Sequence, residues 1–353
     1  MKKFIKNYTL DELSREMPEF GEPEYRAEQV FRHMYLQNLT DFKDFSSLPK
    51  ELREKFAEKY EVNTCTLQKV QTSALDGSQK FLFRLPDGNS IESVLIPEED
   101  RLSLCMSSQV GCALGCRFCA TGTLGLKRNL ETGEIVDQFI QAEIASGKKI
   151  TNIIFMGMGE PLQNYENVTR AIKILSGDKV AKLGRKRITI STVGVVPKIY
   201  KLADDELNVK LALSLHATTN GERRHIIPIA KKWDLTELGD AIEYYYRKTK
   251  NSVTYEYIVF DNFNENADDA KRLAKIARRV PSLVNLIPFN DVSFAVEGLD
   301  YPKLNPAPKR KVIEFADMLK QQGTNVFIRW SAGSDIDAAC GQLALSERTE
   351  DAV

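Results

Sequence analysis

The segment that decides the fold reads SSQVGCALGCRFCATG, residues 107–122, and it directly follows an apolar run at residues 102–107. It separates Cys112, Cys116 and Cys119 by three and then two residues, in a loop that should leave the end of a strand. Three thiolates at this spacing can surround one iron–sulfur cluster, because cysteine is the usual ligand of such clusters. The glycines within the segment allow the backbone to turn tightly around it.

A cluster held by three cysteines has an open position. One iron of a four-iron cluster is left without a protein donor, and an open metal position is typical of catalytic sites. The alternatives are a structural zinc ion or an electron-transfer cluster, each of which needs a fourth protein ligand. No histidine lies in the loop, since the next along the chain is His216, and Cys105 belongs to the preceding strand. The sequence therefore favours a catalytic cluster.

Around this loop, apolar strand-like runs alternate with amphipathic stretches. The strand-like runs are residues 102–107, 150–156, 187–191, 209–215, 253–260, 284–288 and 324–329. The amphipathic stretches include residues 132–146, 168–176, 235–248, 267–279 and 309–321. Such alternation predicts parallel strands joined by helices. We therefore expect an α/β fold, a partial (β/α)6 barrel rather than a closed eight-fold one, with functional residues at the carboxyl ends of the strands.

Two further regions precede the predicted barrel. The first is a helical module, with apolar residues three and four apart in several runs. The second alternates apolar and polar residues and contains two Asp-Gly pairs, Asp76-Gly77 and Asp87-Gly88, which favour hairpin turns. The predicted division is a helical accessory domain at residues 1–62, a β-meander at 63–99, the barrel at 100–345 and a tail at 346–353.

The composition narrows the class of protein. Of 353 residues, 42% are hydrophobic and 28% are charged, which is typical of a soluble globular chain. No apolar run approaches the roughly 18 residues that span a bilayer, and the N-terminus lacks a signal-peptide pattern. We therefore expect a cytoplasmic protein in which clustered cysteines serve metal binding or catalysis rather than disulfides.

The formal net charge is zero, which argues against non-specific attraction of the whole surface to nucleic acid. Short basic runs such as Arg223-Arg224 and residues 309–311 are expected to be solvated faces, with local RNA contact as the alternative. Charge alone does not identify the partner.

Other predicted strand ends could bind a small ligand. The second strand finishes in MGMGEP, residues 156–161, where glycines allow close backbone approach and Glu160 could hold an ammonium group. Ser191, residues 214–216 and Asn290 also follow predicted strands. By itself, His216 is more simply interpreted as a histidine with satisfied hydrogen bonds than as a catalyst.

These segments together resemble a known family. The cysteine spacing resembles that of the radical S-adenosylmethionine superfamily, and the fuller pattern is similar to RlmN-type dual-specificity rRNA and tRNA adenine methyltransferases. Four further segments match that family: GMGEP at 157–161, STVG at 191–194, SLHA at 214–217 and DIDAACGQL at 335–343. The resemblance spans nearly the whole chain, including the helical module.

The resemblance implies a [4Fe-4S] cluster on the three loop cysteines and S-adenosylmethionine bound at the strand ends. The implied ligand-binding residues are Gly159, Glu160, Ser191, Ser214, Leu215, His216 and Asn290. It also implies that Cys340 becomes methylated, that Cys105 forms a disulfide with Cys340 on product release, and that Glu92 accepts a proton. Without the resemblance, these would be interpreted as buried, inert thiols and an exposed strand residue.

The implied activity is methylation of adenine C2 in 23S rRNA, at adenosine 2503, and in tRNA, at adenosine 37. The implied partners are these two RNAs and a reducing electron donor such as flavodoxin or ferredoxin, with no membrane. The helical module would grip RNA by its shape, or simply cap the barrel. Two alternative functions remain: a C8-specific, Cfr-like rRNA methyltransferase, and a non-catalytic, metal-stabilised RNA-binding protein.

Two segments depart from the family pattern. Residues 291–308 form a longer loop than usual, and Trp330-Ser331-Ala332 follows Arg329 where a polar or basic residue is common. These departures concern the substrate side of the molecule and its RNA contacts, rather than the cluster or Cys340.

Overall fold

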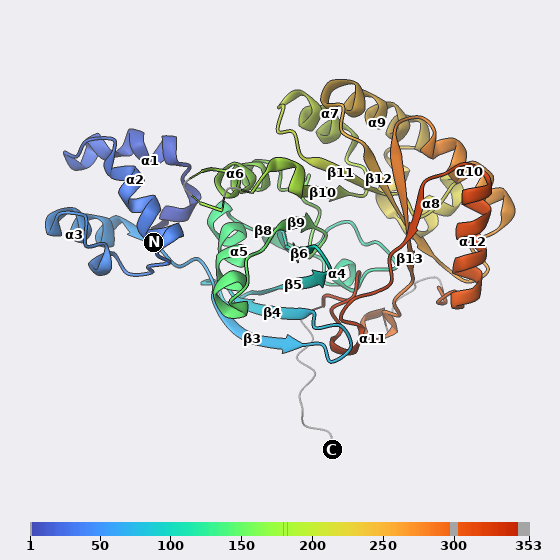
Figure 1. The fold of residues 1–353 in the computed structure, drawn as a ribbon, viewed down its shortest axis with the longest axis horizontal. Coiled ribbons are helices and arrows are strands. Elements are labelled where there is room, and N and C mark those ends of the chain that lie inside the picture. Colours follow the sequence, from blue (N-terminus) through green and yellow to red (C-terminus); the bar gives the residue numbers. More distant parts are fainter. Residues whose placement is uncertain (1, 179, 182, 297–302, 345–353) are drawn as a thin grey trace, which may run out of the picture.

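The computed structural model describes residues 2–178, 180–181, 183–296 and 303–344 (Figure 1). One ten-stranded sheet carries the fold, in the order β14-β13-β12-β11-β10-β9-β6-β5-β4-β3. Seven of its strands pair in parallel: β6 (Arg101–Cys105), β9 (Asn152–Phe155), β10 (Ile188–Thr192), β11 (Lys210–Ser214), β12 (Val253–Val259), β13 (Ser282–Pro288) and β14 (Val326–Ile328). The sheet curves without closing, so the predicted partial α/β barrel is confirmed.

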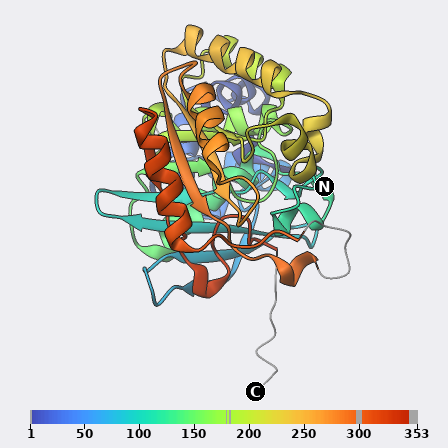
Figure 2. The same ribbon diagram turned by 90° about the vertical axis from the view of Figure 1, so that its right-hand side faces the viewer.

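Helices connect the parallel strands and lie along the outside of the sheet (Figures 1 and 2). They are α5 (Thr132–Ser146), α6 (Tyr165–Leu175), α7 (Val196–Asp204), α8 (Asn220–Ile226), α9 (Leu235–Thr249), α10 (Ala267–Ala277) and α12 (Lys309–Gln321). Local sequence fixes their ends. The Asp234 side chain accepts hydrogen bonds at the start of α9 while Glu237 reaches back to the Asp234 N–H, a capping box. Gly147, with φ 66°, ends α5.

The β-meander extends the same sheet. Strands β3 (Thr66–Thr72), β4 (Gln79–Arg84) and β5 (Ser90–Glu98) form where the alternation predicts them, and they pair antiparallel. The predicted turns contain Gly77 and Gly88, both with positive φ. Strand β5 then pairs antiparallel with β6, which sets Val94 opposite Cys105. The meander is therefore one flank of the barrel sheet, beside the strand that leads into the cysteine loop.

The N-terminal helices lie at one end of the molecule, away from α10 and α12 (Figure 1). They are α1 (Leu10–Glu16), α2 (Arg26–Phe31) and α3 (Lys50–Lys59), with a short β1–β2 pair at Lys3–Phe4 and Tyr60–Glu61. Within the predicted helical module, α2 continues as a π-helical turn, η3 (Arg32–Leu36), and Asn38 follows with φ 54°. Helical periodicity does not distinguish that turn from an α-helix.

A buried ion pair attaches this module to the barrel. Lys6 contacts Asp137 of α5, and both are nearly inaccessible to solvent. The second oxygen of Asp137 accepts hydrogen bonds from the Thr64 N–H and hydroxyl, at 2.8 and 2.6 Å. At Gly133 an added Cβ would lie 2.8 Å from Thr64 Cγ2, so α5 requires a glycine where the module touches it. The contact is thus specific to these side chains.

Short elements complete the described chain. These are α4 (Ala120–Thr123), α11 (Ser293–Val296), the antiparallel pair β7 (Gln109–Gly111) and β8 (Leu126–Asn129), and the single turns η1 (Ile5–Asn7), η2 (Met17–Phe20), η4 (Phe42–Asp44), η5 (Arg185–Arg187), η6 (Pro228–Lys231) and η7 (Ser334–Ile336). No helix of the described residues has the length and apolar character needed to cross a bilayer. The predicted tail at 346–353 lies outside the described residues.

Two buried apolar clusters hold the fold. The larger one fills the space between the sheet and its helices and continues into the N-terminal module. The smaller one packs beneath the cysteine loop and includes Leu114, Phe118, Phe260 and Phe289. The cysteine loop therefore rests on its own apolar base at the carboxyl ends of the strands.

Candidate active site

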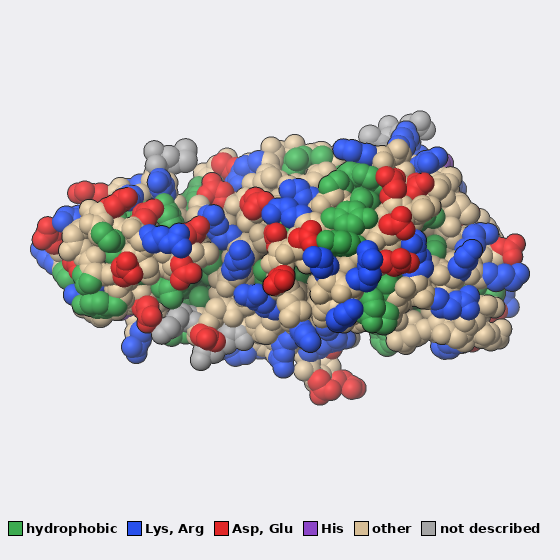
Figure 3. All heavy atoms as spheres, turned by 90° about the horizontal axis from the view of Figure 1, so that it is seen from above, with side chains coloured by type: hydrophobic (Ala, Val, Ile, Leu, Met, Phe, Trp, Pro, Cys, Tyr) green, Lys and Arg blue, Asp and Glu red, His purple; other side chains and the backbone are tan. Residues whose placement is uncertain are grey.

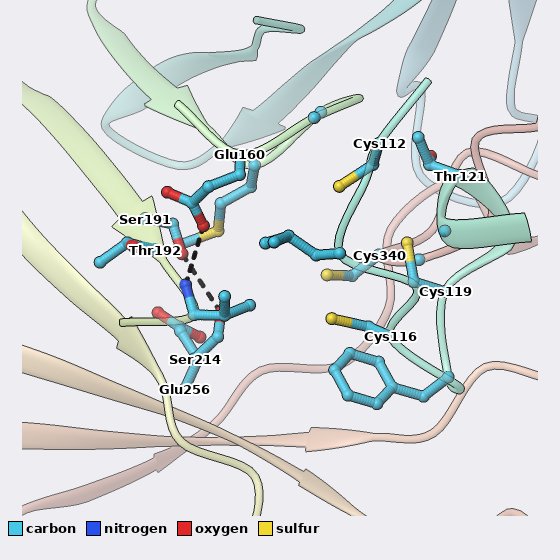
Figure 4. Close-up of a pocket in the computed structure, with 18 of the residues that line it drawn as sticks. Cys112, Cys116, Cys119, Thr121, Glu160, Ser191, Thr192, Ser214, Glu256 and Cys340 are labelled. Atoms are coloured by element: carbon cyan, nitrogen blue, oxygen red, sulfur yellow. Dashed lines mark hydrogen bonds between the residues drawn. The ribbon is translucent and has the colours of Figure 1, made fainter. Parts of the chain in front are cut away.

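The cysteine loop is held by its own backbone. The Cys112 N–H donates to Gly125 O at 2.9 Å, and the Gly122 N–H donates to Cys119 O at 3.0 Å. At Gly111, with φ 75°, an added Cβ would lie 1.9 Å from the Gly125 carbonyl oxygen. The loop therefore requires glycine at that point, which agrees with the expected tight turn. In Figure 4 the sulfurs of all three cysteines face a shared space.

The surroundings of these thiols suit metal ligation. Burial raises the pKa of Cys112 to about 12, and it also raises the pKa values of Cys116 and Cys119. A buried thiolate needs a positive charge beside it, and a bound metal supplies one. Among the described residues, no three His, Cys, Asp or Glu side chains lie close enough together for a single metal ion. Cys112, Cys116 and Cys119 are the donor set that would hold an iron–sulfur cluster, because thiolates are the usual ligands of such clusters.

The cysteines form one wall of a cavity of about 120 Å³. The opposite wall comes from the carboxyl ends of the barrel strands, as expected for this fold. Labelled in Figure 4 on that wall are Glu160, Ser191, Thr192, Ser214 and Glu256. The structure thus brings the predicted cluster ligands and most of the predicted ligand-binding residues to one cavity.

The carboxylate of Glu160 accepts hydrogen bonds from two loops beside the cavity. One oxygen accepts from the Val193 N–H and the other from the Leu162 N–H, each at 3.0 Å. Burial raises its pKa to about 7, against the opposing effect of these hydrogen bonds. At Gly159, with φ 98°, an added Cβ would lie 2.5 Å from Gln109 Cβ. Gly159 and Glu160 both line the cavity. Each carboxylate oxygen of Glu160 already accepts one hydrogen bond from the protein backbone.

His216 is a neutral, structural residue in this site. Its Nδ1 accepts from the Ile258 N–H at 3.0 Å, its carbonyl accepts from Asn264 Nδ2 at 2.8 Å, and its φ is 56°. Burial lowers its pKa to about 3, helped by the nearby Arg223 charge. The imidazole therefore stays uncharged, in agreement with the interpretation that it is not a base. Leu215, also predicted, is buried and lines no cavity described here.

Arg223 corrects one expectation from the sequence. It was expected on a solvated or RNA-contacting face, but its side chain is only 1% exposed. It donates to the carbonyls of Val193, Ser214 and Leu215, at 2.5, 3.2 and 3.1 Å. Arg223 thus fixes two strand-end loops of the cavity. A basic pair in the last turn of a short helix gives no sign of this, because the hydrogen-bond partners of Arg223 are backbone carbonyls of other segments.

Cys340 projects into the cavity from the C-terminal loop. Its backbone is tied to the cluster loop, since the Ala120 N–H donates to Gly341 O at 2.7 Å and Thr121 Oγ1 donates to Leu343 O at 2.5 Å. Asn290, predicted as a ligand contact, donates to Cys340 O at 3.1 Å. Its side-chain oxygen accepts from Ser331 Oγ at 2.6 Å. The structure therefore shows Asn290 positioning the Cys340 loop.

Cys340 also lines a second, smaller cavity of about 40 Å³, together with Cys105, Arg329 and Trp330. Cys105, on β6, is buried, whereas Cys340 is exposed to solvent within the cavities, and both are free thiols here. Burial raises their pKa values to about 12 and 11, while the positive charge of Arg329 opposes the rise for each. Cys340 thus lies between the cavity of the cluster cysteines and the cavity of Cys105.

The β-meander holds the loop that carries Cys340. Asp76 Oδ2 accepts from the Gly333 N–H at 2.8 Å, and the Ala74 N–H donates to Asp335 Oδ2 at 2.9 Å. Lys80 Nζ lies 3.3 Å from Asp337 O and 3.4 Å from Glu92 Oε1. The contacts of the meander with residues 333–337 join segments about 260 positions apart in sequence.

Glu92 is therefore a buried member of an ion pair, 3% exposed, and not the exposed strand residue that its sequence position suggests without the resemblance. It lies on β5, the strand next to the one that carries Cys105. It is absent from the linings of both cavities described here. Its role as a proton acceptor stays a prediction.

The two segments that depart from the family pattern lie in different places: residues 330–332 line the cavity of Cys105, whereas Val292 and Phe294 of the longer loop pack in the apolar cluster beneath the cysteine loop. Trp330 is 46% exposed, and Lys309 Nζ lies 5.5 Å from the centroid of its ring. The predicted long loop contains α11 and a bridge between Phe260 and Pro306, and its residues 297–302 lie outside the described chain. The residue after Arg329 is thus a half-exposed tryptophan with the ammonium group of Lys309 over its ring.

Comparisons with known proteins agree with this site. The model of the Radical SAM superfamily matches residues 106–274, and the model of the ribosomal RNA large subunit methyltransferase N-terminal domain matches residues 5–62. The crystal structure of a radical SAM methyltransferase from Sphaerobacter thermophilus superposes with a TM-score of 0.89 at 38% identity, covering 97% of this chain and 99% of that one. Fold and site define a radical S-adenosylmethionine enzyme, whose cofactors are a [4Fe-4S] cluster and S-adenosylmethionine.

Full-length relatives narrow the assignment. A protein from Thermotoga neapolitana is 43% identical over 98% of each chain, and one from Clostridium botulinum is 40% identical over 98% of this chain and 97% of its own. Both are named probable dual-specificity RNA methyltransferase RlmN. This chain belongs to the RlmN family of radical S-adenosylmethionine RNA methyltransferases. The non-catalytic alternative is therefore wrong.

Proposed function

We propose that this enzyme forms 2-methyladenosine in 23S rRNA, at adenosine 2503, and in tRNA, at adenosine 37, with Cys340 carrying the methyl group. The observation that carries this proposal is the position of Cys340, between the cavity of the cluster cysteines and the cavity of Cys105. One sulfur can then meet a methyl donor on one side and the RNA base on the other.

The chemistry of the base supports a radical route. Adenine C2 is electron-poor and does not attack a sulfonium methyl group as an amine or thiol does. When bound, the cluster on Cys112, Cys116 and Cys119 supplies the electron that splits S-adenosylmethionine into methionine and a carbon radical. The protein's task is then to present a methyl group, after hydrogen removal, to the base at a fixed position.

Three residues carry out the steps of methyl transfer and RNA release. Cys340 loses its proton and takes a methyl group, since a thiolate is the effective sulfur nucleophile. Its methylene carbon joins the base, which leaves RNA covalently attached to the protein. The thiolate of Cys105, which lines the second cavity with Cys340, then attacks the Cys340 sulfur. The disulfide forms as the bond from that sulfur to the methylene carbon breaks, and this carbon takes up a proton to become the methyl group of the released RNA, after which a reductant must reopen the disulfide. Glu92 accepts the proton that leaves the base.

The RNA must bring an unstacked adenine to Cys340, because this residue is reached through the cavities that it lines. We propose that residues 1–62 grip the RNA by its shape, as a domain distinct from the meander at 63–99 and the barrel at 100–345. The face shown in Figure 3 carries charges of both signs side by side, so recognition by shape suits it better than attraction to one basic face. A cytoplasmic location and an electron donor of the flavodoxin or ferredoxin type complete the proposal.

Nucleoside analysis tests this function directly. The anaerobically reconstituted enzyme is incubated with S-adenosylmethionine, a reductant and unmodified 23S rRNA or tRNA, and the digested RNA is compared with authentic methyladenosines. We expect 2-methyladenosine from both RNAs. A product that coelutes with 8-methyladenosine would instead support the C8-specific alternative, and product from one RNA only would restrict the dual specificity.

A further inference from the structure

Glu256 is a cavity residue that the sequence did not single out. It lies on β12 with its Cα paired to that of Ser214 on β11, and it is 3% exposed. Asn285 Nδ2 donates to its Oε1 at 3.1 Å, but its Oε2 is buried without a hydrogen-bond partner. Figure 4 shows Glu256 on the strand-end wall of the cavity, across from the cysteine sulfurs.

An unpartnered buried carboxylate oxygen is costly, and most buried polar atoms are hydrogen-bonded. Burial raises the pKa of Glu256, while the charge of Arg329 and the Asn285 amide oppose that rise. Neither neighbour satisfies Oε2. Because that oxygen belongs to a residue lining the cavity, the missing donor is expected to arrive with a ligand.

The two sides of the cavity indicate which part of a ligand reaches Glu256. The cysteine side is where the open iron position would bind one end of S-adenosylmethionine. The opposite wall offers hydroxyls and a carboxylate: Ser191 Oγ lies 3.5 Å from Ser214 Oγ, and Glu256 lies next to Ser214. Acceptors grouped in this way suit the neighbouring hydroxyls of a ribose, and carboxylates bind ribose hydroxyls in other nucleotide sites.

We propose that Glu256 Oε2 accepts a hydrogen bond from a ribose hydroxyl of S-adenosylmethionine. Glu256 is thus a cofactor-binding residue that holds the nucleoside half of the ligand while the methionine half lies at the cluster. The proposal rests on S-adenosylmethionine binding in this cavity and does not require that RNA is the methyl acceptor.

Equilibrium binding without turnover tests the contact. The dissociation constant of S-adenosylhomocysteine, and of its 2′,3′-dideoxyribose analogue, is measured by anaerobic calorimetry on the unreduced, cluster-reconstituted protein. Glu256→Gln should weaken binding of S-adenosylhomocysteine about 10- to 100-fold, the range for a hydrogen bond to a charged group. The variant should then distinguish little between the two ligands, whereas the wild type prefers the ribose form.

Matched variants separate this role from a structural one. Glu166→Gln, at a side chain 77% exposed on α6, is the control and should bind as the wild type does. Glu256→Gln should melt close to the wild type, because its amide oxygen can still accept from Asn285 while the unpartnered carboxylate oxygen is removed. Glu256→Asp, which keeps the charge but withdraws the oxygen, should show an intermediate loss, and it replaces the Gln variant if that one does not fold.

Three results would overturn the proposal. The first is unchanged affinity for S-adenosylhomocysteine in both Glu256 variants. The second is an equal loss for the ribose and dideoxyribose ligands, because the carboxylate would then not sense the hydroxyls. The third is loss of RNA binding alone, which would assign Glu256 to the substrate. If the enzyme fails to methylate RNA yet shows the ribose-dependent loss, only the proposed function fails.

Discussion

Two groups of cysteines in this protein differ in what surrounds them. Cys112, Cys116 and Cys119 lie on one short loop, whose backbone hydrogen bonds and glycines set the position of each sulfur. Cys105 and Cys340 come from segments far apart in sequence, a barrel strand and the C-terminal loop, and share the Arg329 charge. The metal-binding cysteines can therefore be recognised from their spacing in the sequence. The reactive pair can be recognised only from the folded structure, because its members come from distant segments.

Loss of one cluster ligand should have the largest effect. Cys112→Ala leaves two thiolates for the cluster, so we expect loss of bound iron and of both S-adenosylmethionine cleavage and RNA methylation, about 10³-fold or more. Iron and sulfide analysis with the two activity assays measures this. Full iron content with normal turnover would remove Cys112 from the ligand set.

Cys340→Ala should separate the function of the reactive cysteines from that of the cluster cysteines. We expect methyl transfer to fall about 10³-fold or more, because the carrier sulfur is gone, while iron content stays normal and S-adenosylmethionine cleavage persists at least in part. The measurement is RNA methylation and deoxyadenosine release in the same reaction. Normal RNA methylation by this variant would show that no methylcysteine is needed at position 340.

Arg329→Met should have a moderate effect on the reactive cysteines. Arg329 lowers the pKa of Cys340 from the higher value that burial alone would give, so its loss raises that pKa above about 11. At pH 8 the thiolate fraction falls, and alkylation of Cys340 by iodoacetamide in metal-free protein should slow by about tenfold, with the rate curve moved to higher pH. Arg329→Lys is the control that keeps the charge. Unchanged or faster alkylation in the Met variant would contradict this account.

Cys65→Ala should have the smallest effect. Cys65 is buried near Asp137, far in sequence from both groups, and it lines neither cavity. We expect a loss of unfolding free energy of about 1 kcal/mol, seen as a small fall in Tm, with iron content and methylation unchanged. Loss of iron from this variant would mean that a fourth cysteine takes part in the cluster.

The same difference explains what could be predicted from sequence. Strand and helix alternation and the cysteine spacing are local signals, so the barrel, the meander and the cluster loop were predicted near their observed bounds. Burial of Arg223 and the Lys80–Glu92 pair depends on which distant backbone meets each side chain, and no local pattern carries that information. Glu256 did leave a signal, a lone charge within the apolar strand VTYEYIV, but only the structure shows its unpartnered oxygen.

The central claim is that Cys340 carries the methyl group, and its most direct test is mass spectrometry of the protein itself. Trypsin should release residues 330–348, in which Cys340 is the only cysteine, after anaerobic incubation with trideuteromethyl-labelled S-adenosylmethionine. The account predicts the labelled methyl on Cys340 and none on the peptides that contain Cys65 or Cys105. An unlabelled Cys340 in enzyme that transfers the label to RNA would contradict it.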